Sequence, residues 1–103
     1  MNIAKMMQAA ATAQKKMAKI QEELAQRKVE ATSGGGRVTV TATGTGEILS
    51  LKIAPEVVSA DDVEMLEGLI LSAVRQAMAD AKKMSESEMG KLTAGLGMPG
   101  LPF

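Results

Sequence analysis

The chain has 103 residues, of which 46% are hydrophobic, with 12 basic and 12 acidic side chains and a single aromatic residue, Phe103. It contains neither cysteine nor histidine, which excludes disulfides, zinc sites of the usual kind and thiol or imidazole catalysis. We therefore expect one small domain that needs a partner, with no enzymatic activity, cofactor, metal or small-molecule substrate.

The net charge of zero conceals two segments of opposite sign. Residues 1–54 carry eight cations against four anions, a charge of +4, whereas residues 55–90 carry three cations against eight anions, a charge of −5. A basic segment can face a polyanion while the whole chain stays soluble. No stretch is apolar enough for a secretory signal or a membrane span, so a cytoplasmic protein without a membrane partner is expected.

The beginning of the chain predicts a long helix, from about Ile3 to Arg27, because Ala, Lys, Gln, Glu and Met dominate it. Its apolar side chains recur at alternating steps of three and four residues, as in a coiled coil. We expect this apolar stripe to lie in the interface of a homodimer. Its members are Ile3, Met6, Ala10, Ala13, Met17, Ile20 and Leu24.

After the helix, apolar and polar residues alternate in three short runs, which predicts a three-stranded antiparallel meander. Gly34-Gly35-Gly36 and Gly44-Thr45-Gly46 separate the runs. The triple glycine precedes a strand and lacks the Lys-Ser or Lys-Thr of a phosphate-binding loop, so it predicts a hairpin turn. Ile48 falls on the wrong face of the third run, and we assign it to the dimer interface. The runs cover residues 29–32, 37–43 and 49–53.

A second long helix is predicted from about Ala60 to Met89, with Ser59 and Asp62 capping its start and an apolar face broad enough to cover a sheet. Gly68 in its interior is expected to mark a close approach to the sheet. Acidic residues in the first turn suit a helix N-terminus better than a metal site. The chain thus predicts an α+β domain of order α-β-β-β-α over residues 1–89 and a flexible tail rich in glycine and proline over residues 90–103.

Four lysines of the first helix fall within an arc of roughly 100° at 100° per residue, opposite the apolar stripe, with few acidic neighbours. A dimer would present two such stripes to the phosphates of double-stranded DNA. Because lysine lacks the fork of arginine that reads guanine, little sequence specificity is expected. The candidate DNA-binding residues are Lys5, Lys15, Lys16, Lys19, Arg27, Lys28, Arg37 and Lys52.

The whole chain also resembles the YbaB/EbfC family of bacterial nucleoid-associated proteins. The resemblance implies a homodimer whose helices project as a tweezer-like pair, and non-enzymatic DNA binding that organises the nucleoid and influences gene expression. The blocks that carry it are Met6-Met7-Gln8, Gly34-Gly35-Gly36-Arg37-Val38-Thr39-Val40, Gly44-Thr45-Gly46-Glu47-Ile48, Leu51-Lys52-Ile53-Ala54-Pro55, residues 62–67 and residues 89–97.

One alternative function stays open at this point. A protein-interaction module would use the apolar stripe, the methionine side chains and the tail to bind another protein, and its lysines would only keep the long helix soluble. Salt-dependent binding to duplex DNA distinguishes the two functions.

Overall fold

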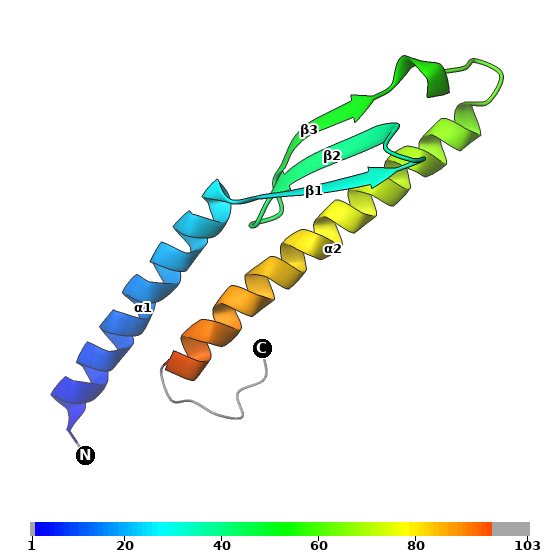
Figure 1. Cartoon of the computed structure of the whole chain (residues 1–103). Helices are drawn as coiled ribbons and strands as arrows, with labels where there is room; N and C mark the ends of the chain where they lie inside the picture. Colours follow the sequence, from blue (N-terminus) through cyan, green and yellow to red (C-terminus); the bar gives the residue numbers. More distant parts are fainter. Residues whose placement is uncertain (1, 96–103) are drawn as a thin grey trace.

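The computed structural model describes residues 2–95 and has the predicted α-β-β-β-α order. Figure 1 shows the three strands along one side of the long second helix, and the first helix extending beyond the sheet at one end. The molecule is elongated, measuring 70 × 24 × 16 Å along its principal axes. Its elements are α1 (Ile3–Gln26), β1 (Lys28–Ser33), β2 (Val38–Thr43), β3 (Ile48–Ile53), the short 3-10 helix η1 (Pro55–Val57) and α2 (Val63–Gly95).

Helix α1 forms where the sequence predicts it, because no glycine or proline interrupts its hydrogen bonds. The side chain of Asn2 caps its start by accepting a hydrogen bond from the Lys5 amide at 3.3 Å. The helix stops where Arg27 adopts an extended backbone, with φ −86° and ψ 153°. Strand β1 begins at the next residue, so α1 joins the sheet almost without a linker.

The sheet has the order β1-β2-β3, and both pairs of neighbouring strands are antiparallel. Gly34, Gly35 and Gly36 connect β1 to β2 with φ values of 60°, 68° and 88°, a region of the backbone map that other residues rarely adopt. The predictions of a meander and of a hairpin turn at the triple glycine are therefore confirmed.

The pairing of β2 with β3 contains one irregularity that corrects the expected position of Ile48. Thr41 pairs with Ser50, but the next residue of β2, Ala42, pairs with Ile48, so Leu49 is the extra residue of a β-bulge. Paired residues of antiparallel strands share a face, so Ile48 lies on the same face as the buried Ala42. Strict alternation of side chains along the third run predicts the opposite face for Ile48. The prediction is wrong because an alternating pattern does not show that a bulge interrupts it.

The core lies between the sheet and α2. Val38, Val40 and Ala42 of β2 are fully buried and pack against Ala73 and Ala77 of α2. The alanines allow the helix to approach the sheet closely, while larger apolar side chains of α2 surround this contact. The prediction that the second helix covers the sheet is confirmed for β1 and β2.

Strand β3 receives little cover from α2. Ile48, Leu49 and Leu51 keep 41–48% of their surface exposed, although Ala42 and Val40, the β2 partners of Ile48 and Leu51, are buried. Met78 of α2, also exposed, lies beside the turn before β3, with its Cε 3.5 Å from the place where a Cβ on Gly46 would sit. We call these four exposed residues, Ile48, Leu49, Leu51 and Met78, the β3 patch. Adjacent exposed apolar residues of this kind mark an interaction surface.

Helix α2 begins slightly later than predicted. Asp62 is its N-cap, because its carboxylate accepts a hydrogen bond from the Met65 amide at 3.2 Å. Ser59 instead accepts a hydrogen bond from the Asp61 amide, which stabilises a turn ahead of the helix. The helix therefore starts at Val63, three residues after the predicted Ala60.

The end of α2 differs more from the prediction. The helix continues through Gly90 to Gly95, so residues 90–95, which the sequence assigned to a flexible tail, are helical. Leu92 and Thr93 are half-buried, and Leu92 lines a cleft together with Ile20 of α1. Packing against α1 thus compensates for the low helix propensity of glycine. The rest of the predicted tail, residues 96–103, lies outside the described residues.

Candidate nucleic-acid interface

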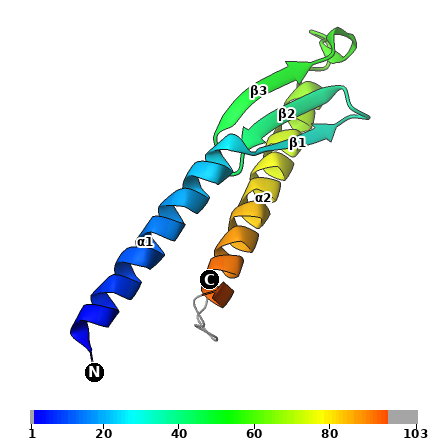
Figure 2. The ribbon, with the colours of Figure 1, turned by 60° about the vertical axis from the view of Figure 1, so that its left-hand side comes forward.

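Four of the candidate DNA-binding lysines lie on α1, and Figure 2 shows the N-terminal end of this helix diverging from α2. Lys5, Lys15, Lys16 and Lys19 are all exposed. Within residues 2–95, none of them forms an ion pair, and the first acidic residues of α1 are Glu22 and Glu23. This part of α1 therefore presents positive charge to solvent that no ion pair among residues 2–95 neutralises.

The other end of α1 is fixed firmly to the sheet and to α2. Leu24 is only 1% exposed, and its carbonyl oxygen accepts a hydrogen bond from the Gly44 amide at 2.9 Å. The same amide donates to the Arg27 carbonyl at 3.2 Å. A Cβ on Gly44 would lie 2.9 Å from both the Cδ2 and the carbonyl oxygen of Leu24, and 3.0 Å from the Met84 sulfur. Only glycine fits between α1, β2 and α2 here.

The sequence predicts a close approach between packed elements at Gly68, but the structure has that close approach at Gly44. A Cβ on Gly68 would meet nothing within 4 Å, and this residue lines a shallow groove on the outer face of α2. The two glycines are equally plausible from local sequence, because only the tertiary fold determines which of them is crowded.

A cleft of 330 Å³ separates α1 from the C-terminal part of α2. Charged side chains from both helices surround it, together with one apolar residue from each. Its lining consists of Lys16, Lys19, Ile20 and Glu23 from α1 and Glu88, Lys91 and Leu92 from α2.

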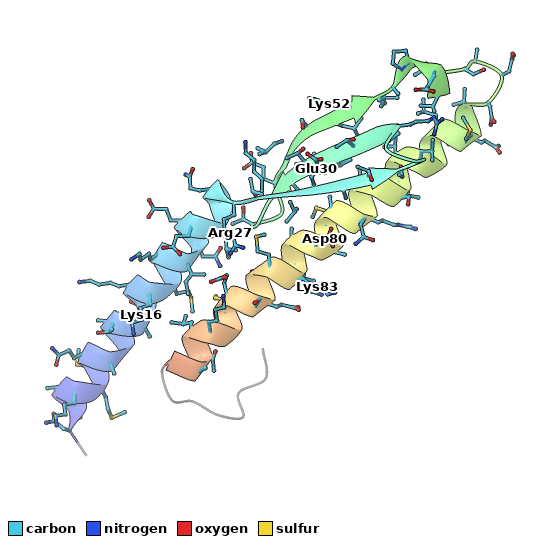
Figure 3. The ribbon with its side chains drawn as sticks, in the orientation of Figure 1. Lys16, Arg27, Glu30, Lys52, Asp80 and Lys83 are labelled. Carbon is cyan, nitrogen blue, oxygen red and sulfur yellow. The ribbon has the colours of Figure 1, made fainter. Side chains whose placement is uncertain are left out.

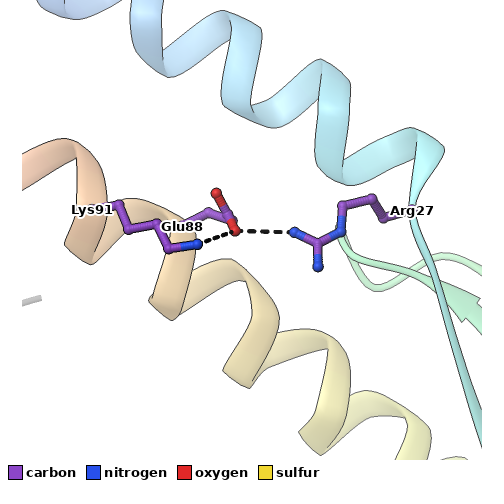
Figure 4. Close-up of polar contacts among 3 residues, drawn as sticks. All are labelled: Arg27, Glu88 and Lys91. Atoms are coloured by element: carbon purple, nitrogen blue, oxygen red, sulfur yellow. Dashed lines mark hydrogen bonds and ion pairs between the residues drawn. The ribbon is translucent and has the colours of Figure 1, made fainter.

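Arg27 closes the same region through a three-residue ion network (Figure 4). Its Nη1 donates to Oε1 of Glu88 at 3.0 Å, and Nζ of Lys91 donates to the same oxygen at 3.2 Å. These two hydrogen bonds hold the pKa of Glu88 below its ordinary value of 4.5. The bond from Lys91 has the larger effect and the bond from Arg27 the smaller. Glu88 stays ionised at neutral pH and binds two cations at once.

The remaining predicted cations lie elsewhere. Figure 3 shows Lys16 on α1, Arg27 just after the end of this helix, and Lys52 well away from both on β3. Arg37 is engaged at the first hairpin, where it donates to the Gly34 carbonyl at 2.9 Å and to Glu56 at 3.4 Å. Lys28 is exposed at the start of β1, next to Arg27. The structure therefore brings together Lys16, Lys19 and Arg27, and leaves Arg37 and Lys52 apart from them.

Lys91 joins this group, although it is not among the cations predicted to bind DNA. The sequence places it in the flexible tail, because Gly90 and the glycine-rich residues after it resemble the end of a helix. The available signal was the spacing of Met84, Glu88 and Leu92 at steps of four, which continues one helical face past Gly90.

The predicted dimer residues divide into three groups. Ile3, Met6, Ala10 and Met17 are exposed on α1, and Ile48 is exposed in the β3 patch. Ala13 and Ile20 are half-buried. Leu24 is buried in the chain's own core, so its side chain leaves no surface for a partner. Part of the predicted coiled-coil stripe is therefore used within the chain, to pack α1 on α2.

Over the described range, 2–95, no helix is long and apolar enough to cross a membrane. The same residues contain no group of three or more acidic side chains arranged to hold a metal ion.

Comparison with a solved structure shows the fold. An uncharacterized protein from Helicobacter pylori superposes with a TM-score of 0.73 at 23% identity, over 93% of this chain and 97% of that chain. This architecture, with a lysine-bearing helix that extends beyond the sheet, defines a class of small two-helix, three-strand proteins.

Sequence comparison then shows the family. The model of the YbaB/EbfC DNA-binding family matches residues 1–96, and the chain belongs to this family. A nucleoid-associated protein of Thermoanaerobacter pseudethanolicus is 51% identical over 100 residues, covering 97% of this chain and 90% of the relative. A nucleoid-associated protein of Bacillus cereus is 51% identical over 87 residues, covering 84% of this chain and 80% of the relative. The family is one of nucleoid-associated DNA-binding proteins, not of enzymes.

Proposed function

We propose that this protein binds double-stranded DNA as a homodimer with little sequence specificity, changes the conformation of the DNA, and thereby contributes to nucleoid organisation and gene regulation in the cytoplasm. It does so without catalysis. The observation that carries the proposal is the group of four exposed lysines on α1, which have no ion-pair partner among residues 2–95. DNA phosphates are the counter-charge that this helix lacks.

The side chains present favour contact with phosphates over reading of bases. Lysine ammonium groups bind phosphates as point charges without the planar fork that recognises guanine. Two of the three arginines, Arg27 and Arg37, are engaged with the carboxylates of Glu88 and Glu56. Any preference among DNA sites would then come from the shape and deformability of the duplex.

A homodimer is supported by the exposed apolar surface of the monomer. The β3 patch and the exposed part of the α1 stripe together leave more large apolar side chains in water than a small domain normally tolerates. A second copy of the chain would cover one of these surfaces and would double the number of lysines that face the duplex.

Titration of a mixed-sequence duplex by fluorescence anisotropy at several salt concentrations tests this function. We expect the logarithm of affinity to fall linearly with the logarithm of salt concentration, with a slope of several units. Changing Lys15, Lys16 and Lys19 together to Gln should reduce the slope by about two to three units, because each lysine neutralises about one phosphate.

Arg75, Lys82 and Lys83 provide a control of equal charge, since all three are exposed on α2 and none belongs to α1. Their joint change to Gln removes positive charge while leaving the slope nearly intact. Absence of DNA binding at low salt would refute the proposal. It would favour a protein-interaction module, for which the exposed Ile3, Met6 and Met7 of α1 are the specific supporting observation.

A further inference from the structure

We propose that the cleft between α1 and α2 is a binding site for one backbone phosphate of DNA, in which Glu88 occupies the place of the phosphate when DNA is absent. Arg27 and Lys91 are the two cations that would transfer from this carboxylate to the phosphate. The proposal rests on the proposed function, and it adds α2 to a DNA-binding surface that α1 alone would otherwise provide.

The exposure of the three side chains supports such an exchange. Arg27 and Lys91 keep 49% and 71% of their side-chain surface exposed, whereas Glu88 keeps 22%. The carboxylate thus lies behind the two cations, and the cations face the solvent from which DNA approaches. One oxygen of Glu88 accepts both hydrogen bonds, at 3.0 and 3.2 Å, as a phosphate oxygen can do.

The charges around the cleft also favour a phosphate. Lys16 and Lys19 line it beside Lys91, and Arg27 lies at its edge. Glu22 lies beside Arg27, and two carboxylates in the lining of the cleft itself oppose these four cations, Glu23 and Glu88. Of these two, only Glu88 forms ion pairs among the described residues, so it is the group that reduces the positive potential of the cleft most directly.

Competition between two anions for the same cations has a direct consequence for affinity. A phosphate that approaches Arg27 and Lys91 must either displace the Glu88 carboxylate or be repelled by it at close range. Glu88 therefore lowers the affinity for DNA while it stabilises the contact between α1 and α2. Removal of its charge should free two cations for the phosphate.

The test compares two variants that change the net charge equally. Glu88→Gln removes the charge that bonds Arg27 and Lys91, whereas Glu86→Gln removes an exposed carboxylate on the same helix that makes no hydrogen bond or ion pair within the described part of the chain. Anisotropy titration of the full chain with a mixed-sequence duplex should show roughly three- to five-fold tighter binding for Glu88→Gln than for Glu86→Gln. The salt slope should become steeper by about one unit.

A second pair of variants tests whether Lys91 is one of the cations that bind the phosphate. Lys91→Gln in the wild-type background should weaken binding only slightly, because the phosphate gains Lys91 only at the expense of the hydrogen bond from Lys91 to Glu88. In the Glu88→Gln background, Lys91→Gln should abolish most of the gain. Circular dichroism of each variant confirms that the fold persists, as expected from the separate anchoring of α1 by Leu24 and Gly44.

Two results would overturn the inference. Equal affinities for Glu88→Gln and Glu86→Gln would show that Glu88 acts only through net charge. Weaker binding by Glu88→Gln would show that Glu88 positions Arg27 for DNA and does not compete with it. In both cases the wild-type protein still binds DNA, so the proposed function would stand, whereas failure of every variant to bind DNA would remove the proposed function itself.

Discussion

Gly44 and Gly68 illustrate how one residue type has opposite roles in the same chain. We expect Gly44→Ala to lower the free energy of unfolding by about 2 kcal/mol, because its Cβ would collide with the backbone and side chain of Leu24. We expect Gly68→Ala to raise it by about 1 kcal/mol, because alanine has the higher helix propensity and space is open there. Urea unfolding followed by circular dichroism measures both changes.

These two variants should be compared at one protein concentration, since any dimer makes apparent stability depend on concentration. Gly90→Ala is a useful companion to Gly68→Ala, because Gly90 also lies in α2 and a Cβ there would meet nothing within 4 Å. An unchanged stability for Gly44→Ala would contradict the crowded contact between α1 and β2.

At the scale of elements, the contact between α1 and α2 depends on pH through Glu88. The pKa of Glu88 is lower in the folded protein than its ordinary value of 4.5, so its stabilising effect is complete above that value and is lost as the pH falls through the lower, folded pKa. Acidification should therefore loosen α1 from α2, although Leu24 keeps the end of α1 anchored.

Spin labels on the two helices can measure this loosening. The chain has no cysteine, so Gln8→Cys and Ser87→Cys, both at exposed positions, give specific attachment sites. The distribution of label distances should be narrow at neutral pH and broad in acid. With Glu88→Gln added, it should already be broad at neutral pH; a narrow distribution in that variant would contradict the role of the ion network.

Most elements could be predicted from local sequence because their signals are local. The helical period of α1, the alternation of the strands and the triple glycine of the first hairpin each act within a few residues. The extension of α2 beyond Gly90 could not be predicted this way, since it depends on packing against α1. Lys91 could not be predicted as part of the site either, because it lies in this extension of α2. The lysines of α1 could be predicted because they share one face of a single helix.

At the scale of the whole molecule, two exposed apolar surfaces are candidates for the dimer interface. They are the β3 patch and the exposed part of the α1 stripe. We expect the β3 patch to carry the interface, because part of the α1 stripe is already used inside the chain, where Leu24 is buried and Ala13 and Ile20 are half-buried. Leu49→Glu should then yield a monomer, since a carboxylate in an apolar interface is costly to desolvate. Met6→Glu on α1 should remain dimeric.

Size-exclusion chromatography with light scattering gives the mass of each variant directly. A monomeric Met6→Glu together with a dimeric Leu49→Glu would move the interface to α1. A monomeric wild-type protein would remove the homodimer from the proposed function.

The elongated shape has one more consequence, because the charges of the chain are separated along it. The lysines of α1 lie toward one end of a molecule 70 Å long, and the acidic residues around η1 and the start of α2 lie toward the other (Figure 1). Such a lengthwise dipole experiences a torque near a polyanion, within a few screening lengths of about 8 Å at physiological salt. We therefore expect this torque to turn the chain so that α1 approaches the DNA first, before any side chain makes contact.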